Sequence, residues 1–180
     1  MLSDQTGRNL ADAFRRAATA TLIRSAGDVC DVKVATKGAD SELQTESPLL
    51  LITISSFVFR LVAIFQISSN EATRQYYTGS GAAETPEETF TEVVNLCCGA
   101  LSRELSTQFK HLAMSIPYRL EASSLKFLGE LKAGLTTTLD ITINDSARMR
   151  ATLCMFASRP IELAAPAAEV SHAGGALEMF

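Results

Sequence analysis

Two polar residues one helical turn apart, Glu92 and Asn95, are the side chains of this sequence best suited to do chemistry. On a helix their spacing makes them neighbours on one face. A carboxylate can pair with a cation, whereas a carboxamide can hold a water molecule but takes up no proton near neutral pH. The pattern E-x-x-N is short, and most copies of it belong to ordinary solvated helix faces. The residues around the pair therefore determine how it is interpreted.

The segment 85–111 around this pair carries the signals of a long amphipathic helix. Thr85 can cap the first turn, Glu88 can reach back to complete a capping box, and Pro86 suits the first helical position. Apolar residues recur with helical spacing on one side and polar residues gather on the other. The apolar side consists of Phe90, Val93, Val94, Cys97, Leu101, Leu105 and Leu112. Glu92 and Asn95 are therefore expected to face solvent.

Three more residues of the polar side are predicted to contact a partner, namely Leu96, Gly99 and Arg103. Leu96 is apolar although it lies beside Asn95. A glycine in the middle of a helix costs about 1 kcal/mol relative to alanine, so Gly99 suggests that another molecule approaches the helix backbone there.

Other chemistries lack the residues that they need. The two histidines are His111, at the predicted end of the helix, and His172, near the C-terminus, and they show no spacing typical of a metal site or of a hydrolase with a histidine base. No phosphate-binding glycine motif is present. The four cysteines include no C-x-x-C pair, and Cys97 and Cys98 are expected to be buried, reduced thiols.

The composition is that of a globular domain, with 47% hydrophobic and 20% charged residues. We expect one domain over residues 1–160 and an Ala/Gly-rich tail over residues 161–180. A net charge of −4 with no basic stripe argues against nucleic acid as a partner. The apolar run 49–67 is interrupted by polar residues, and the N-terminus lacks the apolar segment of a signal peptide, so no membrane contact and a cytoplasmic location are expected.

The rest of the chain predicts an α+β fold in which an antiparallel sheet packs against the helix 85–111 and an N-terminal helix. Alternation, turn residues and helix caps define the elements. Before the long helix we expect a helix over 4–26 closed by Gly27, a strand over 29–35, a loop over 37–48 and a hairpin over 49–67 that turns at 55–57. A short helix follows, which Ser69 or Asn70 caps and which ends at Gly79, and then a connector over 79–84. After the long helix we expect an edge strand over 115–121, either a strand or an irregular crossing over 123–131, and a hairpin of 135–143 with 147–157.

The run Glu92-Val93-Val94-Asn95-Leu96-Cys97-Cys98-Gly99 resembles the E-x-x-N-x-x-x-G signature of the CheX/CheC phosphatases of bacterial chemotaxis. The layout of elements over residues 10–157 is similar as well. The chain has one such motif, as CheX has, rather than the two of CheC. Flagellar switch proteins of the FliM type share the fold but are not expected to keep the catalytic pair. Val93 and Val94 stand where relatives often have smaller residues.

The resemblance implies dephosphorylation of the aspartyl phosphate of a CheY-like response regulator. Asn95 would orient the attacking water, and Glu92 would pair with the active-site lysine of the regulator. Mg²⁺ would come with the regulator, so the chain would need no cofactor of its own. A homodimer is a further expectation, because CheX-like proteins are similar in forming dimers. Two alternatives stay open: a non-catalytic module that docks a receiver domain, and a structural homodimer.

Overall fold

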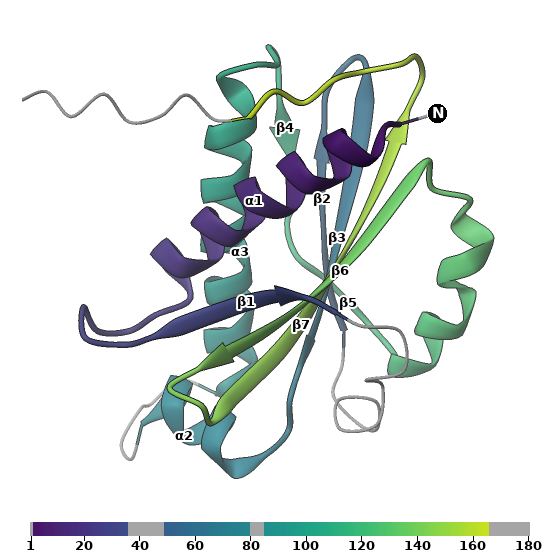
Figure 1. Ribbon diagram of the computed structural model, residues 1–180. Coiled ribbons are helices and arrows are strands. Elements are labelled where there is room, and N and C mark those ends of the chain that lie inside the picture. The colour runs from purple at the N-terminus through teal and green to yellow at the C-terminus, as the bar shows by residue number, and fades with distance from the viewer. Residues whose placement is uncertain (1, 36–48, 80–84, 166–180) are drawn as a thin grey trace, which may run out of the picture.

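The computed structural model describes residues 2–35, 49–79 and 85–165, and these residues form an antiparallel sheet with helices against it (Figure 1). The predicted α+β class is therefore confirmed. The elements are α1 (Asp4–Thr21), β1 (Cys30–Val34), β2 (Leu49–Ser55), β3 (Phe59–Ile67), α2 (Glu71–Thr78), α3 (Pro86–Ser106), β4 (Ala113–Met114), β5 (Tyr118–Leu120), the 3₁₀ helix η1 (Ala122–Leu131), β6 (Leu135–Ile143) and β7 (Ala147–Ala157).

The sheet has the strand order β1-β6-β7-β3-β2-β4, with β5 also paired to β2. Its two hairpins are the ones that the sequence predicts. The first, β2–β3, turns at residues 56–58, one residue later than predicted, and the second, β6–β7, turns at residues 144–146. The positive φ angles of Asn144 and Asp145 fit this second turn, because both residue types tolerate the left-handed region. The short helix α2 begins at the cap Asn70 and is closed by Gly79 at φ +62°, again as predicted.

The two faces of the sheet are covered by different elements. On one face, alternate residues of β2 and β3, such as Ile52, Leu61 and Phe65, are fully buried under α1 and α3. On the other face, Val62 and Ile64 pack against η1, which lies across the sheet from α1 (Figure 1). The segment 123–131, ambiguous in the sequence, is therefore a 3₁₀ helix that shields the second face.

Helix α1 ends at Thr21, so the prediction that it runs to Ala26 and is closed by Gly27 was wrong. The loop that follows is held by tertiary contacts that a continued helix would lose. The Asp28 carboxylate accepts from the backbone N–H groups of Arg24 and Ser25 and from the Tyr76 hydroxyl of α2. These bonds lower the pKa of Asp28 to about 2, the bonds from Asn144 and Tyr76 contributing most.

Helix α3 ends at Ser106, five residues before the predicted end near His111. Beyond it, the ring of Phe109 packs edge-on against Phe59 of β3, with 4.9 Å between the ring centroids. His111 then adopts a positive φ of 59°, and the chain turns into β4, which pairs with β2. Leu112, assigned to the apolar side of the helix from its spacing, therefore lies outside the helix.

Of the edge strand predicted over 115–121, only β5 (118–120) is a strand; β4 lies just before the predicted start, and both strands pair with β2. Pro117 lies between them. Because proline has no N–H to donate, the edge ladder is interrupted at this residue. Ser115 keeps the interrupted segment attached to the sheet, since its N–H donates to the Thr53 carbonyl and its hydroxyl accepts from the Thr53 N–H.

The chain continues past residue 160 along α1, where Ile161 and Leu163 are buried. Their carbonyls accept hydrogen bonds from Thr6 and Asn9 of α1. The predicted loop 37–48, the connector over 80–84 and the tail from residue 166 lie outside the described residues, so the domain boundary at residue 160 stays a prediction. Among the helices of the described ranges, none is both long enough and apolar enough to cross a membrane.

The packing of α3 against the core can be tested by comparing Leu101 with Leu96 on the same helix. Leu101 is fully buried, whereas Leu96 is 52% exposed. We expect Leu101→Ala to lower the free energy of unfolding by about 2–5 kcal/mol, because it opens a cavity in the core. Leu96→Ala should change it by less than about 1 kcal/mol. Urea titrations of both variants measure the difference, and equal losses would contradict the packing of α3.

Candidate functional site

The first turn of α3 is built as the sequence predicts. The Thr85 hydroxyl accepts from the Glu88 N–H at 3.3 Å, and the Glu88 carboxylate accepts from the Thr85 N–H at 3.1 Å. Pro86 occupies the first helical position, where its missing N–H leaves no bond unmade. This capping box defines where α3 begins, and the start sets the positions of all later side chains along the helix.

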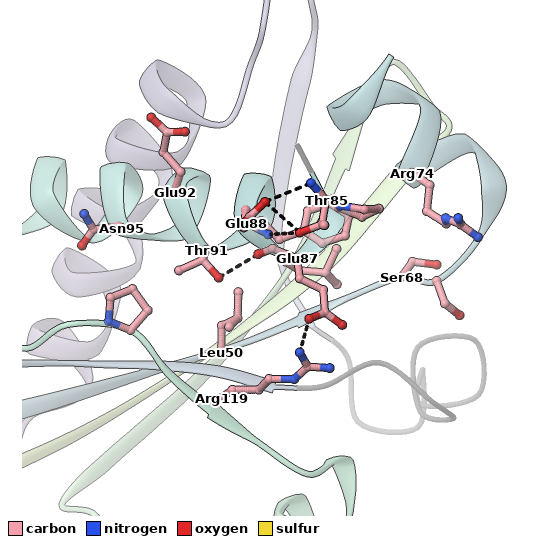
Figure 2. Close-up of a pocket in the computed structure, with 15 residues that line it drawn as sticks. Leu50, Ser68, Arg74, Thr85, Glu87, Glu88, Thr91, Glu92, Asn95 and Arg119 are labelled. Carbon is pink, nitrogen blue, oxygen red and sulfur yellow. Dashed lines mark hydrogen bonds and ion pairs between the residues drawn. The ribbon is translucent and has the colours of Figure 1, made fainter. Parts of the chain in front are cut away.

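The exposed side of α3 contains all five residues that the sequence proposes for the site. Glu92, Leu96 and Arg103 are exposed, while Asn95 and Gly99 are half-buried. Within the part of the chain that the structure describes, the side chains of Glu92 and Asn95 make no hydrogen bond or ion pair. Both project from α3 in Figure 2. A carboxylate and a carboxamide are thus available to a second molecule, one helical turn apart.

The opposite side of α3 holds the helix in this rotation. Val94, Cys97, Cys98 and Leu101 are fully buried against the sheet and α1. Cys98 was not among the residues assigned to the apolar side, so the buried arc is wider than the spacing predicts. Burial raises the pKa of the Cys97 thiol to about 12, and that of Cys98 rises as well. These thiols are therefore protonated at neutral pH and are poor nucleophiles.

Gly99 has open space above it. A Cβ atom at this position would have as its near neighbour the Arg103 guanidinium at 3.7 Å, an ordinary van der Waals distance. The packing of the described chain therefore does not itself require glycine here. The effect of Gly99 is to leave the helix backbone uncovered between Asn95 and Arg103.

A cavity of about 710 Å³ opens along the first turns of α3 (Figure 2). Its lining includes Leu50 and Ile67 of the sheet, and Pro117 and Arg119 of the edge segment, where Arg119 is the cross-strand partner of Leu50. Glu92 and Asn95 belong to its lining as well. No sequence pattern predicts the residues that α2, β2 and β5 bring to this cavity, because they come from positions far apart in the chain.

An ion pair closes one side of the cavity. The Arg119 guanidinium of β5 donates to the Glu87 carboxylate in the first turn of α3, and both side chains are more than half exposed. The hydrogen bond from Arg119 is the main cause of a lowered pKa at Glu87. Arg119 thus links the short edge strand to the start of the helix that carries Glu92 and Asn95.

Within the described ranges, no three His, Cys, Asp or Glu side chains lie close enough together to hold a metal ion. His111 is exposed and its ring packs against Phe57, with 5.7 Å between ring centroids. His172 lies outside the described residues. The chemistry of the site is therefore best sought in Glu92 and Asn95.

The Arg119–Glu87 pair can be tested directly. In Arg119→Ala the lost guanidinium no longer favours the ionised carboxylate, so the pKa of Glu87 should rise toward its ordinary value of 4.5. An NMR titration of the side-chain carboxyl carbons would follow this. Lys126→Ala, which removes an exposed cation from η1, is the control and should leave Glu87 unchanged; an identical Glu87 curve in Arg119→Ala would disprove the pair.

This chain is similar to known proteins in its three-dimensional structure but not detectably in its sequence. No family model matches the sequence, and no curated protein is found as a relative. CheX in the CheX–CheY–BeF3–Mg complex of Borrelia burgdorferi superposes with a TM-score of 0.58 at 10% identity, over 84% of this chain and 97% of that one. Chemotaxis protein CheX of Vibrio vulnificus superposes with a TM-score of 0.55 at 13% identity, over 81% and 98%.

FliY of Thermotoga maritima superposes with a TM-score of 0.52 at 14% identity, over 86% of this chain and 89% of that one. At these identities the likeness concerns the arrangement of the backbone, and it spans nearly all of each neighbour. The resemblance seen first in the signature helix thus extends to the sheet and to the helices that cover it. The chain has the CheC-like fold of the CheX chemotaxis proteins and FliY.

Proposed function

We propose that this protein hydrolyses the aspartyl phosphate of a CheY-like receiver domain. The observation that carries the proposal is the pair Glu92 and Asn95, which lies on the solvent side of α3 without any partner in the described residues. The fold supports it, since a CheX protein of the same fold was solved in complex with CheY. Because an aspartyl phosphate is already an activated acyl phosphate, the enzyme can act mainly by positioning.

In the proposed reaction, the oxygen of a water molecule forms a bond to phosphorus as the bond between phosphorus and the aspartyl oxygen breaks. The aspartate leaves as a carboxylate, and the protons of the water pass to the released phosphate and to solvent. The Asn95 carboxamide orients the water in line with the breaking bond, and it takes up no proton itself. The receiver supplies the Mg²⁺ that balances the charge on the phosphoryl oxygens.

Glu92 sets the register of docking in this proposal. Its carboxylate is exposed and unpaired in the described chain, so it is available to the lysine of the receiver active site. Leu96 supplies an apolar contact next to it, and Gly99 lets the receiver come close to the α3 backbone. Arg103 adds a cation at the far end of the same face.

A non-catalytic docking module is the second candidate. Asn95 is only half exposed, whereas Glu92 and Leu96 are well exposed, which favours docking over water positioning. A structural homodimer without a receiver partner is the third candidate. The exposed apolar side chains Met114, Ile116 and Tyr118 along the β4–β5 edge favour such an interface.

Asn95→Ala separates catalysis from docking. We expect it to slow phosphate release from a phosphorylated receiver by about a hundredfold or more, because the water is no longer held in line. Binding to the same receiver carrying beryllium fluoride should change little. Gln75→Ala removes an exposed carboxamide from α2 and is the matched control. Equal rates for wild type and Asn95→Ala, with binding intact, would leave only the docking module.

Substitution of Glu92 tests whether this residue fixes the position in which the receiver docks on α3. Glu92→Lys should weaken binding to the receiver by about tenfold or more, because two like charges then meet. The same measurement with a receiver whose active-site lysine is replaced by glutamate should restore part of the affinity. Glu130→Lys, on the exposed side of η1, is the control for the change in net charge. If Glu92→Lys binds as wild type does, Glu92 has no part in docking.

A further inference from the structure

The cavity beside α3 has the features of a small-molecule site, and its apolar lining and its cation have no part in the proposed phosphatase activity. Its volume of about 710 Å³ lies within the range of about 300–1,000 Å³ found for ligand pockets. Side chains from β2, β3, α2, α3 and the β4–β5 segment meet around it, so its walls come from packed elements of one core. The apolar part of its lining consists of Leu50, Ile67, Pro86, Phe90 and Pro117.

Two of the three carboxylates that line this cavity have partners, and the third points away from its apolar residues. Glu87 is paired with Arg119, and the Glu88 carboxylate accepts from the N–H and hydroxyl of Thr85. Glu92 projects from α3 on the side away from Leu50 and Arg119 in Figure 2. These contacts leave little free negative charge facing the apolar lining.

One end of the cavity offers unused donors. The Arg74 guanidinium of α2 makes no hydrogen bond or ion pair within the described chain. Ser68 lies at the same end as Arg74, opposite Asn95 (Figure 2). Its Oγ accepts from the Asn70 N–H at 3.3 Å, which leaves the hydroxyl hydrogen free to donate. Ser69, the next residue in the chain, also lines the cavity. An arginine beside a hydroxyl is suited to a carboxylate or phosphate group.

We propose that this cavity binds a small amphiphilic anion. A ring or short chain lies on Leu50, Ile67 and Phe90, and a single carboxylate or phosphate lies at Arg74 and Ser68. The site is separate in chemistry from the proposed phosphatase and does not depend on it. Because Asn95 lines the opposite end, a bound molecule also occupies space beside the face that we assign to the receiver.

Two fluorescent probes that share one aromatic body test the proposal without any receiver. They are 8-anilinonaphthalene-1-sulfonate, which is an anion, and N-phenyl-1-naphthylamine, which is neutral. The chain contains no tryptophan, so the emission of the wild-type complexes reports on the probes alone. Arg74→Gln should weaken binding of the anionic probe by about three- to tenfold and leave the neutral probe unchanged. Arg8→Gln, on the exposed side of α1, should change neither.

A second variant fills the cavity itself. Thr91 lines the cavity and its hydroxyl only donates to the Glu87 carbonyl within the same helix, so Thr91→Trp can fill the space without a change to the core. We expect it to reduce binding of both probes by about tenfold or more. Ser106→Trp places the same ring at the exposed end of α3, outside the cavity, and should bind both probes as wild type does.

Three outcomes would overturn the proposal. Equal binding by Thr91→Trp and Ser106→Trp would mean that the probes lie on another surface, such as the apolar β4–β5 edge. If Arg74→Gln lowered the affinity for the neutral probe as much as that for the anionic probe, Arg74 would not select an anion. Absence of saturable binding to the wild-type protein would remove the site. None of these results bears on phosphate release, so the two proposals fail independently.

Discussion

The rotation of α3 about its own axis is the constraint on which the candidate site depends. Each residue advances by about 100° around a helix, so a helix that buries Val94, Cys97 and Leu101 must present Glu92 and Asn95 on its other side. The burial of this apolar arc against the sheet is worth far more than any exposed polar contact can be. The core therefore orients the two polar residues through the backbone of the helix.

The edge of the sheet joins this helix at its first turn. Arg119 reaches Glu87 from β5, and β5 is held in turn by its pairing with β2. The pair is exposed, so it contributes little to stability by itself. It links the edge strand to the first turn of α3, and both of its residues line the cavity. The helix face and the cavity thus share one scaffold while they differ in chemistry.

The predictions that rest on contacts between residues close in sequence were correct, whereas those that depend on contacts between distant residues failed. The start of α3 was predicted correctly because Thr85, Pro86 and Glu88 act within one turn. Its end was placed too late, since spacing alone continues to Leu112 whereas the packing of Phe109 on Phe59 redirects the chain. The error at α1 has the same origin, because Asp28 and Tyr76 are far apart in sequence and hold the loop after Thr21 together.

Local sequence was enough to predict the order of the elements other than η1, both hairpins, the N-caps of α2 and α3, and the face of α3 that carries Glu92 and Asn95. All of these depend on local hydrogen bonds and on the period of apolar residues. Tertiary contacts determine where α1 and α3 end, that β4 and β5 are separated at Pro117, and that Leu50, Arg74 and Arg119 line one cavity with Asn95. These features depend on contacts between residues distant in the chain, and such contacts exist only once the sheet has formed.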